Sequence, residues 1–241
     1  MKKLTLLFLG CIAALSLASC TGKYADASGD LLTAATITNS ELIRLSKEMR
    51  DVGDKENRVA PASDMYAIRL AKMTNKLKNE DGLNLNFKVY ITKDINANAT
   101  ADGSIRVYSG LMDMMTDDEL FYVVGHEIGH VKNQDSLNQI RKAYLSSGII
   151  KAAGANSQTL TNTQLGGLLH TAINAQYSQK AEYAADEYGY RMMKKYGVNT
   201  RGAVTALHKI DSLGKSGGFL ASHPNSADRA NKLENLIKSG K

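Results

Sequence analysis

Residues 120–131 read Leu120-Phe121-Tyr122-Val123-Val124-Gly125-His126-Glu127-Ile128-Gly129-His130-Val131, and this stretch decides the fold. On an α-helix, residues four apart lie on one face, so His126 and His130 can both reach one zinc ion. Glu127 lies beside them and is placed to act as general base on a water activated by that metal. The apolar residues before His126 predict a buried helix, and Gly129 removes a side chain where a strand or substrate could come close. Taken alone, the pattern leaves a second interpretation open, in which two surface histidines merely fall four residues apart.

A third ligand is expected from the segment Glu182-Tyr183-Ala184-Ala185-Asp186, because catalytic zinc usually takes three protein ligands and leaves one position for water. Glu182 can complete a His-His-Glu set. Asp186, one helical turn later, can accept the free ring N–H of His126, and such a partner fixes the tautomer of a ligand histidine. The alternative is a solvated acidic face. Asp135 is expected on the same helix as the histidines, away from their face, and is therefore not expected at the site.

The N-terminus has the pattern of an export signal followed by a lipid anchor. A basic start and an apolar run over residues 4–15 predict a signal peptide over residues 1–19. Leu17-Ala18-Ser19-Cys20 resembles the lipobox of bacterial lipoproteins, which predicts lipidation of Cys20 and a lipidated tether over residues 20–29. The histidine and acid motifs predict that the remaining residues, 30–241, form a zinc metallopeptidase domain. An ordinary secretory signal with an incidental cysteine is the alternative. Loss of Cys11 with the signal would leave one cysteine, so no internal disulfide is expected.

The charge pattern gives no indication of nucleic-acid binding. Removing Lys2 and Lys3 with the signal lowers the formal net charge from +6 to +4, and the lysines and arginines are scattered along a chain without tryptophan. A mildly basic surface near anionic lipid explains this balance. The expected partners are therefore the membrane, through the N-terminal lipid, and polypeptides rather than nucleic acid.

Periodicity and turn signals predict helices over residues 40–50, 61–77 and 110–115, a helix that starts at residues 116–119 and carries the histidine pair, and helices around Glu182 and over 225–238. Strands are predicted over 86–92, 96–100 and 105–108. Gly53 is expected to break the charged segment 51–60. The helix after Pro61 should bury one stripe, formed by Met65, Ile68, Leu70, Met73 and Leu77. Further signals are a hairpin turn at Asp102-Gly103, a capping box from Thr116 to Glu119 and a helix end at Gly197; beyond Gln158 only helices and loops are expected.

These elements predict an α+β fold, mostly helical, with a small antiparallel sheet next to the active-site helix. The strand over residues 96–100 is expected at the edge of that sheet, where it could hold an extended peptide through main-chain hydrogen bonds. A simple loop is the other interpretation of this stretch.

Several motifs together make the chain similar to the CAAX-prenyl-protease-like, HtpX-type zinc metallopeptidases, a gluzincin family. The motifs run from about residue 85 to the end and comprise Asn96-Ala97, Gly103-Ser104-Ile105, Gly110-Leu111, Gly125 to His130, Glu182 to Asp186, and Ser222-His223-Pro224 with Arg229. The lipobox and residues 108–115 further resemble lipoprotein members in enteric bacteria, although this chain lacks the extra cysteines such relatives could pair.

That resemblance implies a zincin-like (minigluzincin) domain holding one Zn²⁺ through His126, His130 and Glu182, with Asp186 and Arg229 supporting the ligands. It places His223 near the zinc, where the histidine could stabilise the oxyanion or block the open metal position. The alternative is that His223 is only a residue at the start of a helix. The segment Gly214 to Gly218 before it is predicted to be the most flexible in the catalytic region. His170 and His208 are expected to be structural or exposed.

The resulting expectation is a zinc endopeptidase in which Glu127 takes the proton of water and later passes it to the leaving amine. The family implies lipid anchoring at the periplasmic face of the outer membrane, misfolded or unassembled envelope proteins as substrates, and a possible link to envelope assembly machinery. Two alternatives stay open: a zinc-stabilised, non-proteolytic assembly factor for outer-membrane proteins, and an enzyme silenced by His223. A structural zinc site would normally be closed by a fourth ligand and would not need Glu127.

Overall fold

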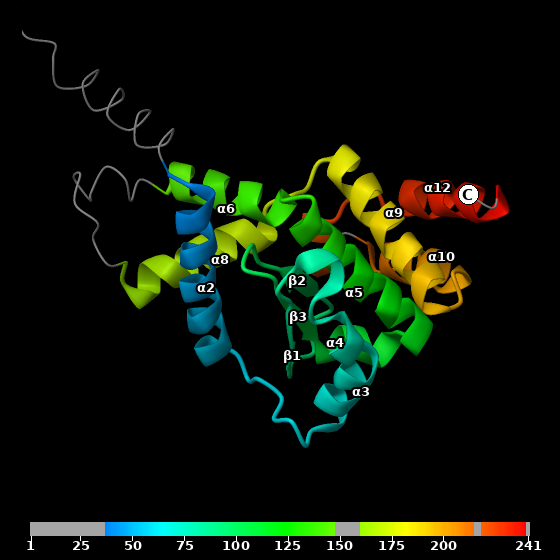
Figure 1. Ribbon diagram of the computed structural model, residues 1–241, viewed down its shortest axis with the longest axis horizontal. Coiled ribbons are helices and arrows are strands. Elements are labelled where there is room, and N and C mark those ends of the chain that lie inside the picture. Colours follow the sequence, from blue (N-terminus) through cyan, green and yellow to red (C-terminus); the bar gives the residue numbers. More distant parts are fainter. Residues whose placement is uncertain (1–36, 148–159, 215–217, 240–241) are drawn as a thin grey trace, which may run out of the picture. The chain divides into compact units, whose positions relative to one another are not determined.

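A computed structural model of the chain describes residues 37–147, 160–214 and 218–239 (Figure 1). The signal peptide, Cys20, the tether and the domain boundary at residue 30 lie outside these residues, as do residues 215–217 of the predicted flexible segment. The elements are α2 (Asn39–Glu56), α3 (Met65–Thr74), two 3₁₀ turns η1 (Asn75–Leu77) and η2 (Glu80–Gly82), β1 (Asn86–Tyr90), β2 (Ala97–Ala99), β3 (Ser104–Tyr108), α4 (Ser109–Met114), α5 (Asp117–Lys132), α6 (Asp135–Ser146), α8 (Asn162–Asn174), α9 (Gln179–Tyr196), α10 (Arg201–Asp211), α11 (Gly218–Ser222) and α12 (Ser226–Lys238). A mostly helical α+β fold is thus confirmed.

The sheet is mixed, in the order β1-β3-β2, so the prediction of an antiparallel sheet is wrong for one of its two pairings. β2 and β3 form the expected antiparallel hairpin around Gly103, whose φ of 86° suits glycine. β1 instead pairs with β3 in parallel. The chain leaves β1, passes to the opposite edge of the sheet to form β2, and then inserts β3 between them. Strand alternation indicates which residues are extended but not their neighbours. The prediction that residues 96–100 contain an edge strand is confirmed.

Helix α5 is the central helix and carries the histidine pair. Thr116 caps its start in the predicted capping box with Glu119. Every residue from Glu119 to His130 is buried, because α9 and α10 pack on α5 from one side and β2 and β3 from another (Figure 1). A helix that is covered on all faces needs a mainly apolar sequence, which residues 120–125 supply.

The pairing of α5 with α9 is unusually close because glycines face it on both helices. A Cβ built on Gly125 would lie 3.0 Å from Gly189 Cα, and one built on Gly129 would lie 2.9 Å from Ala185 Cα. The neighbour that requires Gly129 is therefore helix α9, and not the strand or substrate that the sequence suggested. This contact sets the distance between the helices that carry the histidines and Glu182.

Two predicted helices have different limits in the structure. α2 continues through Gly53 to Glu56, because Gly53 is a packing residue: a Cβ there would lie 2.6 Å from Leu169 Cδ2 of α8. α3 begins at Met65, where Asp64 caps it, rather than at Pro61. Met65 and Ile68 are exposed, so the predicted buried stripe is wrong at its first two positions and is continued by Leu70 and Leu77.

The C-terminal half follows the prediction more closely. α9 ends at Gly197, which adopts a φ of 67°, and the residues described beyond Gln158 contain only helices and loops. α12 begins after Asn225. None of the helices described between residues 37 and 239 has the length and apolar content needed to cross a membrane.

Candidate metal centre

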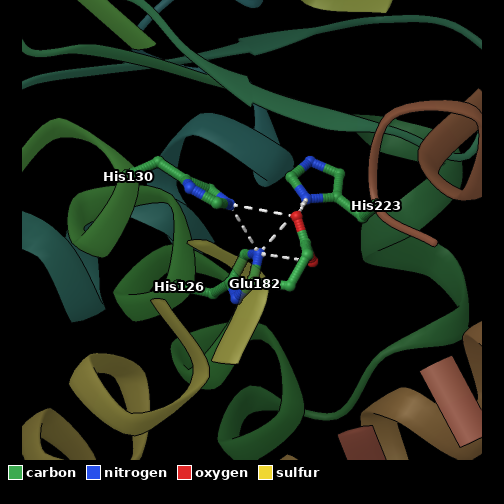
Figure 2. Close-up of side chains that lie close together, drawn as sticks. All are labelled: His126, His130, Glu182 and His223. Carbon is green, nitrogen blue, oxygen red and sulfur yellow. Dashed lines mark hydrogen bonds and ion pairs between the residues drawn. The ribbon is translucent and has the colours of Figure 1, made fainter. Parts of the chain in front are cut away.

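Four buried side chains, His126, His130, Glu182 and His223, point toward one another in the interior (Figure 2). One ligand atom of each lies within 4.8 Å of all the others. The His126 and His130 Nε2 atoms are 3.1 Å apart, and His223 Nδ1 is 3.2 Å from His126 Nε2 and 3.0 Å from Glu182 Oε1. The four residues come from α5, from α9 and from the connection between α11 and α12. The structure thus brings together residues that are up to 97 positions apart in the sequence.

Both the atoms and the charges of this cluster suit a divalent zinc ion. Imidazole nitrogens and carboxylate oxygens are the ligands that zinc takes in proteins. Three fully buried acids, Glu127, Glu182 and Asp186, face a single buried guanidinium, that of Arg229. When these four groups are ionised and the histidines are neutral, as metal binding requires, two negative charges remain, and charges left unbalanced in the interior are strongly destabilising. A bound divalent cation would balance them.

His126 is oriented by Asp186, as the sequence analysis expected. Its Nδ1 lies 2.9 Å from Asp186 Oδ1. Asp186 is held in turn by Arg229, which donates through Nε at 2.9 Å and Nη2 at 2.6 Å, and by the Tyr122 hydroxyl at 2.6 Å. Burial, together with the charge of Arg229, lowers the pKa of His126 to about 3. A neutral imidazole that donates its Nδ1–H to the Asp186 carboxylate presents the Nε2 lone pair to a metal.

The prediction that Asp135 lies on the helix of His126 and His130 is wrong, and although Asp135 is not one of the four converging residues, it contacts one of them. Gln134 adopts a φ of 61° and turns the chain, so Asp135 begins a separate helix, α6. Its Oδ2 then lies 3.0 Å from His130 Nδ1. Burial opposes protonation of His130, but the hydrogen bonds to Asp135 and Glu182 outweigh it and raise the pKa of His130 to about 9. Asp135 is therefore placed to orient His130 as Asp186 orients His126.

Glu182 is completely buried and stays ionised. Burial raises its pKa, but the charges of His223 and Arg229 outweigh this and hold the pKa of Glu182 well below its usual range. Arg229 Nη1 approaches Glu182 Oε2 to 2.5 Å as an ion pair, although the angles are not those of a hydrogen bond. Arg229, which the family resemblance had suggested as a supporting residue, thus contacts both acids of α9.

Glu127 is the buried acid whose oxygens have no hydrogen-bond partner within the described part of the chain. Its side chain is 0% exposed, and His223 Nε2 lies 3.5 Å from its Oε1. Burial raises the pKa of Glu127 above its usual value, against the opposing charges of His223 and His130. A buried carboxylate that accepts no hydrogen bond lowers stability, so its presence calls for an explanation such as a reactive role.

Aromatic rings enclose the cluster, and the sequence analysis did not identify them. Phe219 stacks on His223 with centroids 4.2 Å apart, and Tyr177 stacks on His130 at 3.7 Å. Tyr177 lies in a connection and Phe219 on the short helix α11, and neither has a spacing to the histidines that points to a metal. His170 and His208, expected to be structural or exposed, lie on the surface outside the cluster.

Comparison with known proteins gives consistent matches. The sequence profile of Peptidase family M48 matches residues 67–237. "Metalloprotease YcaL" of Escherichia coli (strain K12) is 39% identical over 214 residues, which cover 86% of this chain and 84% of the relative. "Metalloprotease LoiP" of the same organism is 35% identical over 224 residues, covering 89% and 87%. A "Protease HtpX homolog" of Methanopyrus kandleri is 30% identical over 169 residues, covering 61% and 52%. The profile match includes all four residues of the cluster.

Proposed function

Because the chain belongs to peptidase family M48 and is a zinc metalloendopeptidase, we propose that His126, His130 and Glu182 hold its zinc ion and that Glu127 is its general base. The observation that supports these roles best is the fully buried carboxylate of Glu127, which accepts no hydrogen bond from the described residues, beside the convergent ligand atoms. A site built only to hold a structural metal has no use for such a group.

Zinc, when bound, supplies a Lewis acid that can polarise a peptide carbonyl and acidify water. Glu127 then takes the proton of the attacking water and delivers it to the leaving amine. The absence of a fixed hydrogen bond leaves both oxygens of Glu127 available for the transfer.

His223 lies beside both the ligand atoms and Glu127, which gives it one of two roles. It can donate a hydrogen bond to the oxyanion that forms on the substrate, or it can bind the metal as a fourth ligand. We propose the oxyanion role, because a permanently closed site would leave Glu127 without a function. Phe219 stacks on the His223 ring and would hold it in place for either role.

The chemical step is tested by incubating purified, lipid-free protein with unfolded casein. Cleavage should be complete with the metal-loaded protein, absent after chelation and restored by added zinc. If the loaded protein binds casein without cutting it, the non-proteolytic assembly factor would be the better description. No observation on the structure favours that alternative, since Glu127 would then be an unexplained buried charge.

We further propose that the enzyme is a lipoprotein anchored through Cys20 at the periplasmic face of the outer membrane. The support is the order of small residues before Cys20 and the basic, then apolar, residues at the N-terminus. In this location the substrates would be misfolded or unassembled envelope polypeptides. Labelling cells with radioactive palmitate and separating their membranes tests the anchor. Comparing hydrolysis of one outer-membrane protein in its unfolded and folded forms tests the substrate class, and equal hydrolysis of both would count against it.

A further inference from the structure

Tyr177 lies in the connection between α8 and α9 and contacts the metal centre from outside the ligand set. Its ring stacks on the imidazole of His130, with centroids 3.7 Å apart and ring planes 7° apart. The side chain is only 9% exposed. Its backbone N–H donates to the carbonyl of Ser222 at 3.1 Å, immediately before His223. Tyr177 thus packs on His130 and also holds the segment that carries His223.

The stack restrains His130 in a way that its hydrogen bond cannot. A histidine that binds a metal through Nε2 must keep the lone pair of that nitrogen directed at the ion. Asp135 fixes the Nδ1 end of the ring, but a hydrogen bond at one atom leaves the ring free to tilt about it. A parallel aromatic ring at 3.7 Å opposes that tilt, because tilting the imidazole breaks the face-to-face contact.

His126 has no aromatic ring stacked on it within the described residues and is oriented by hydrogen bonds instead, so the stacking support applies to His130 and not to His126. The ring of Tyr122 lies 6.2 Å from that of His126, with planes 47° apart, so the two do not stack. His126 instead relies on Asp186, which accepts hydrogen bonds from Arg229 and Tyr122. Asp135, by comparison, has an 18% exposed side chain and holds His130 from near the surface. The more exposed hydrogen bond from His130 to Asp135 is thus supplemented by the stacked ring of Tyr177.

We propose that Tyr177 is a positioning residue of the metal centre, whose aromatic ring fixes the orientation of His130 and thereby sets the affinity of the protein for zinc. The inference rests on the proposed role of His130 as a ligand. The ring rather than the hydroxyl carries this role, because the hydroxyl contacts Ser136 Oγ at 3.5 Å, the outer limit of a hydrogen bond.

The test measures the zinc affinity of the metal-free, full-length protein by competition with a chromophoric chelator. Tyr177→Phe keeps the ring and should bind zinc within about twofold of the unaltered protein. Tyr177→Leu removes the flat ring and should bind roughly 10- to 100-fold more weakly, as expected when support of a ligand is lost. Phe121→Leu is the matched control, since Phe121 is an equally buried aromatic residue on α5 that packs on Tyr196 away from the cluster. It should leave zinc affinity unchanged.

Each outcome separates this inference from the proposed function. If His130→Ala keeps full zinc affinity, the ligand assignment itself fails. If His130→Ala loses zinc but Tyr177→Leu binds normally, only the role of Tyr177 is refuted. Loss of affinity in Tyr177→Phe would show that the hydroxyl matters instead of the ring, and equal loss in Phe121→Leu would show a general effect of core truncation. Should Tyr177→Leu fail to fold, Tyr177→Met, which fills the space without a flat ring, is expected to show the same loss.

Discussion

Replacing Gly129 with alanine tests whether the metal centre depends on the close approach of α5 and α9. A Cβ at this position lies 2.9 Å from Ala185 Cα and 3.1 Å from both Ala185 O and Tyr188 Cβ. Ordinary van der Waals contact begins at 3.4 Å, and two of these atoms are backbone, so α9 has to move by about half an ångström. Alanine favours a helix by about 1 kcal/mol over glycine, whereas overpacking of a core costs about 1–3 kcal/mol.

The movement matters for function because Glu182 lies one turn before Ala185 on the same helix. Functional sites tolerate displacements of about 0.5 Å before they lose their geometry. We therefore expect Gly129→Ala to lower the free energy of unfolding by up to about 2 kcal/mol, the overpacking cost less the gain in helix propensity, and to weaken zinc binding by about tenfold.

The matched control is Gly167→Ala on α8, where an added Cβ meets nothing within 4 Å. It should keep full zinc affinity and raise the free energy of unfolding by up to about 1 kcal/mol. Urea denaturation with and without chelator, together with zinc content after dialysis, measures both effects. A Gly129→Ala protein that is as stable as the control and retains all its zinc would refute the reasoning.

Four other substitutions give further tests. Asp135→Asn and Asp186→Ala should each weaken zinc affinity by roughly 10- to 100-fold, because each removes the acid that orients a histidine; chelator competition that detects no change would show these contacts to be unimportant. His223→Ala should lower kcat by roughly 10²- to 10³-fold, as for loss of one oxyanion donor, whereas a higher kcat would identify His223 as a block on the metal. Cys20→Ala should abolish palmitate labelling, and labelling that persists would rule out the proposed anchor.

The spacing of the residues that converge in the cluster could be predicted from the sequence because it is local. His126 and His130 share a face of one helix, as do Glu182 and Asp186, and spacing by four fixes both relations without knowledge of the fold. The meeting of the two pairs was an expectation from chemistry and from the family resemblance. The reason they meet, the contact of Gly125 and Gly129 with α9, could not be predicted, since a glycine does not indicate which element approaches it.

Features that depend on the path of the chain were predicted less well. Asp135 was excluded because Gln134 gave no sign of the left-handed conformation that separates α5 from α6. The parallel pairing of β1 with β3 was missed because alternation does not specify neighbours. Gly53 was taken for a helix breaker, although it serves contact with Leu169. For β1 and for Gly53, a contact with a distant part of the chain decides the structure of residues whose own preference is weak.

The central claim is that Glu127 performs proton transfer beside a zinc ion that it does not bind. The most direct measurement is Glu127→Gln, in which the amide keeps the size of the side chain but cannot accept a proton. Zinc content and casein cleavage should be measured on the same sample, with His126→Ala as the variant expected to lose zinc. We predict full zinc content with no detectable cleavage for Glu127→Gln. Cleavage near the unaltered rate, or loss of the metal together with the activity, would contradict the role assigned to Glu127.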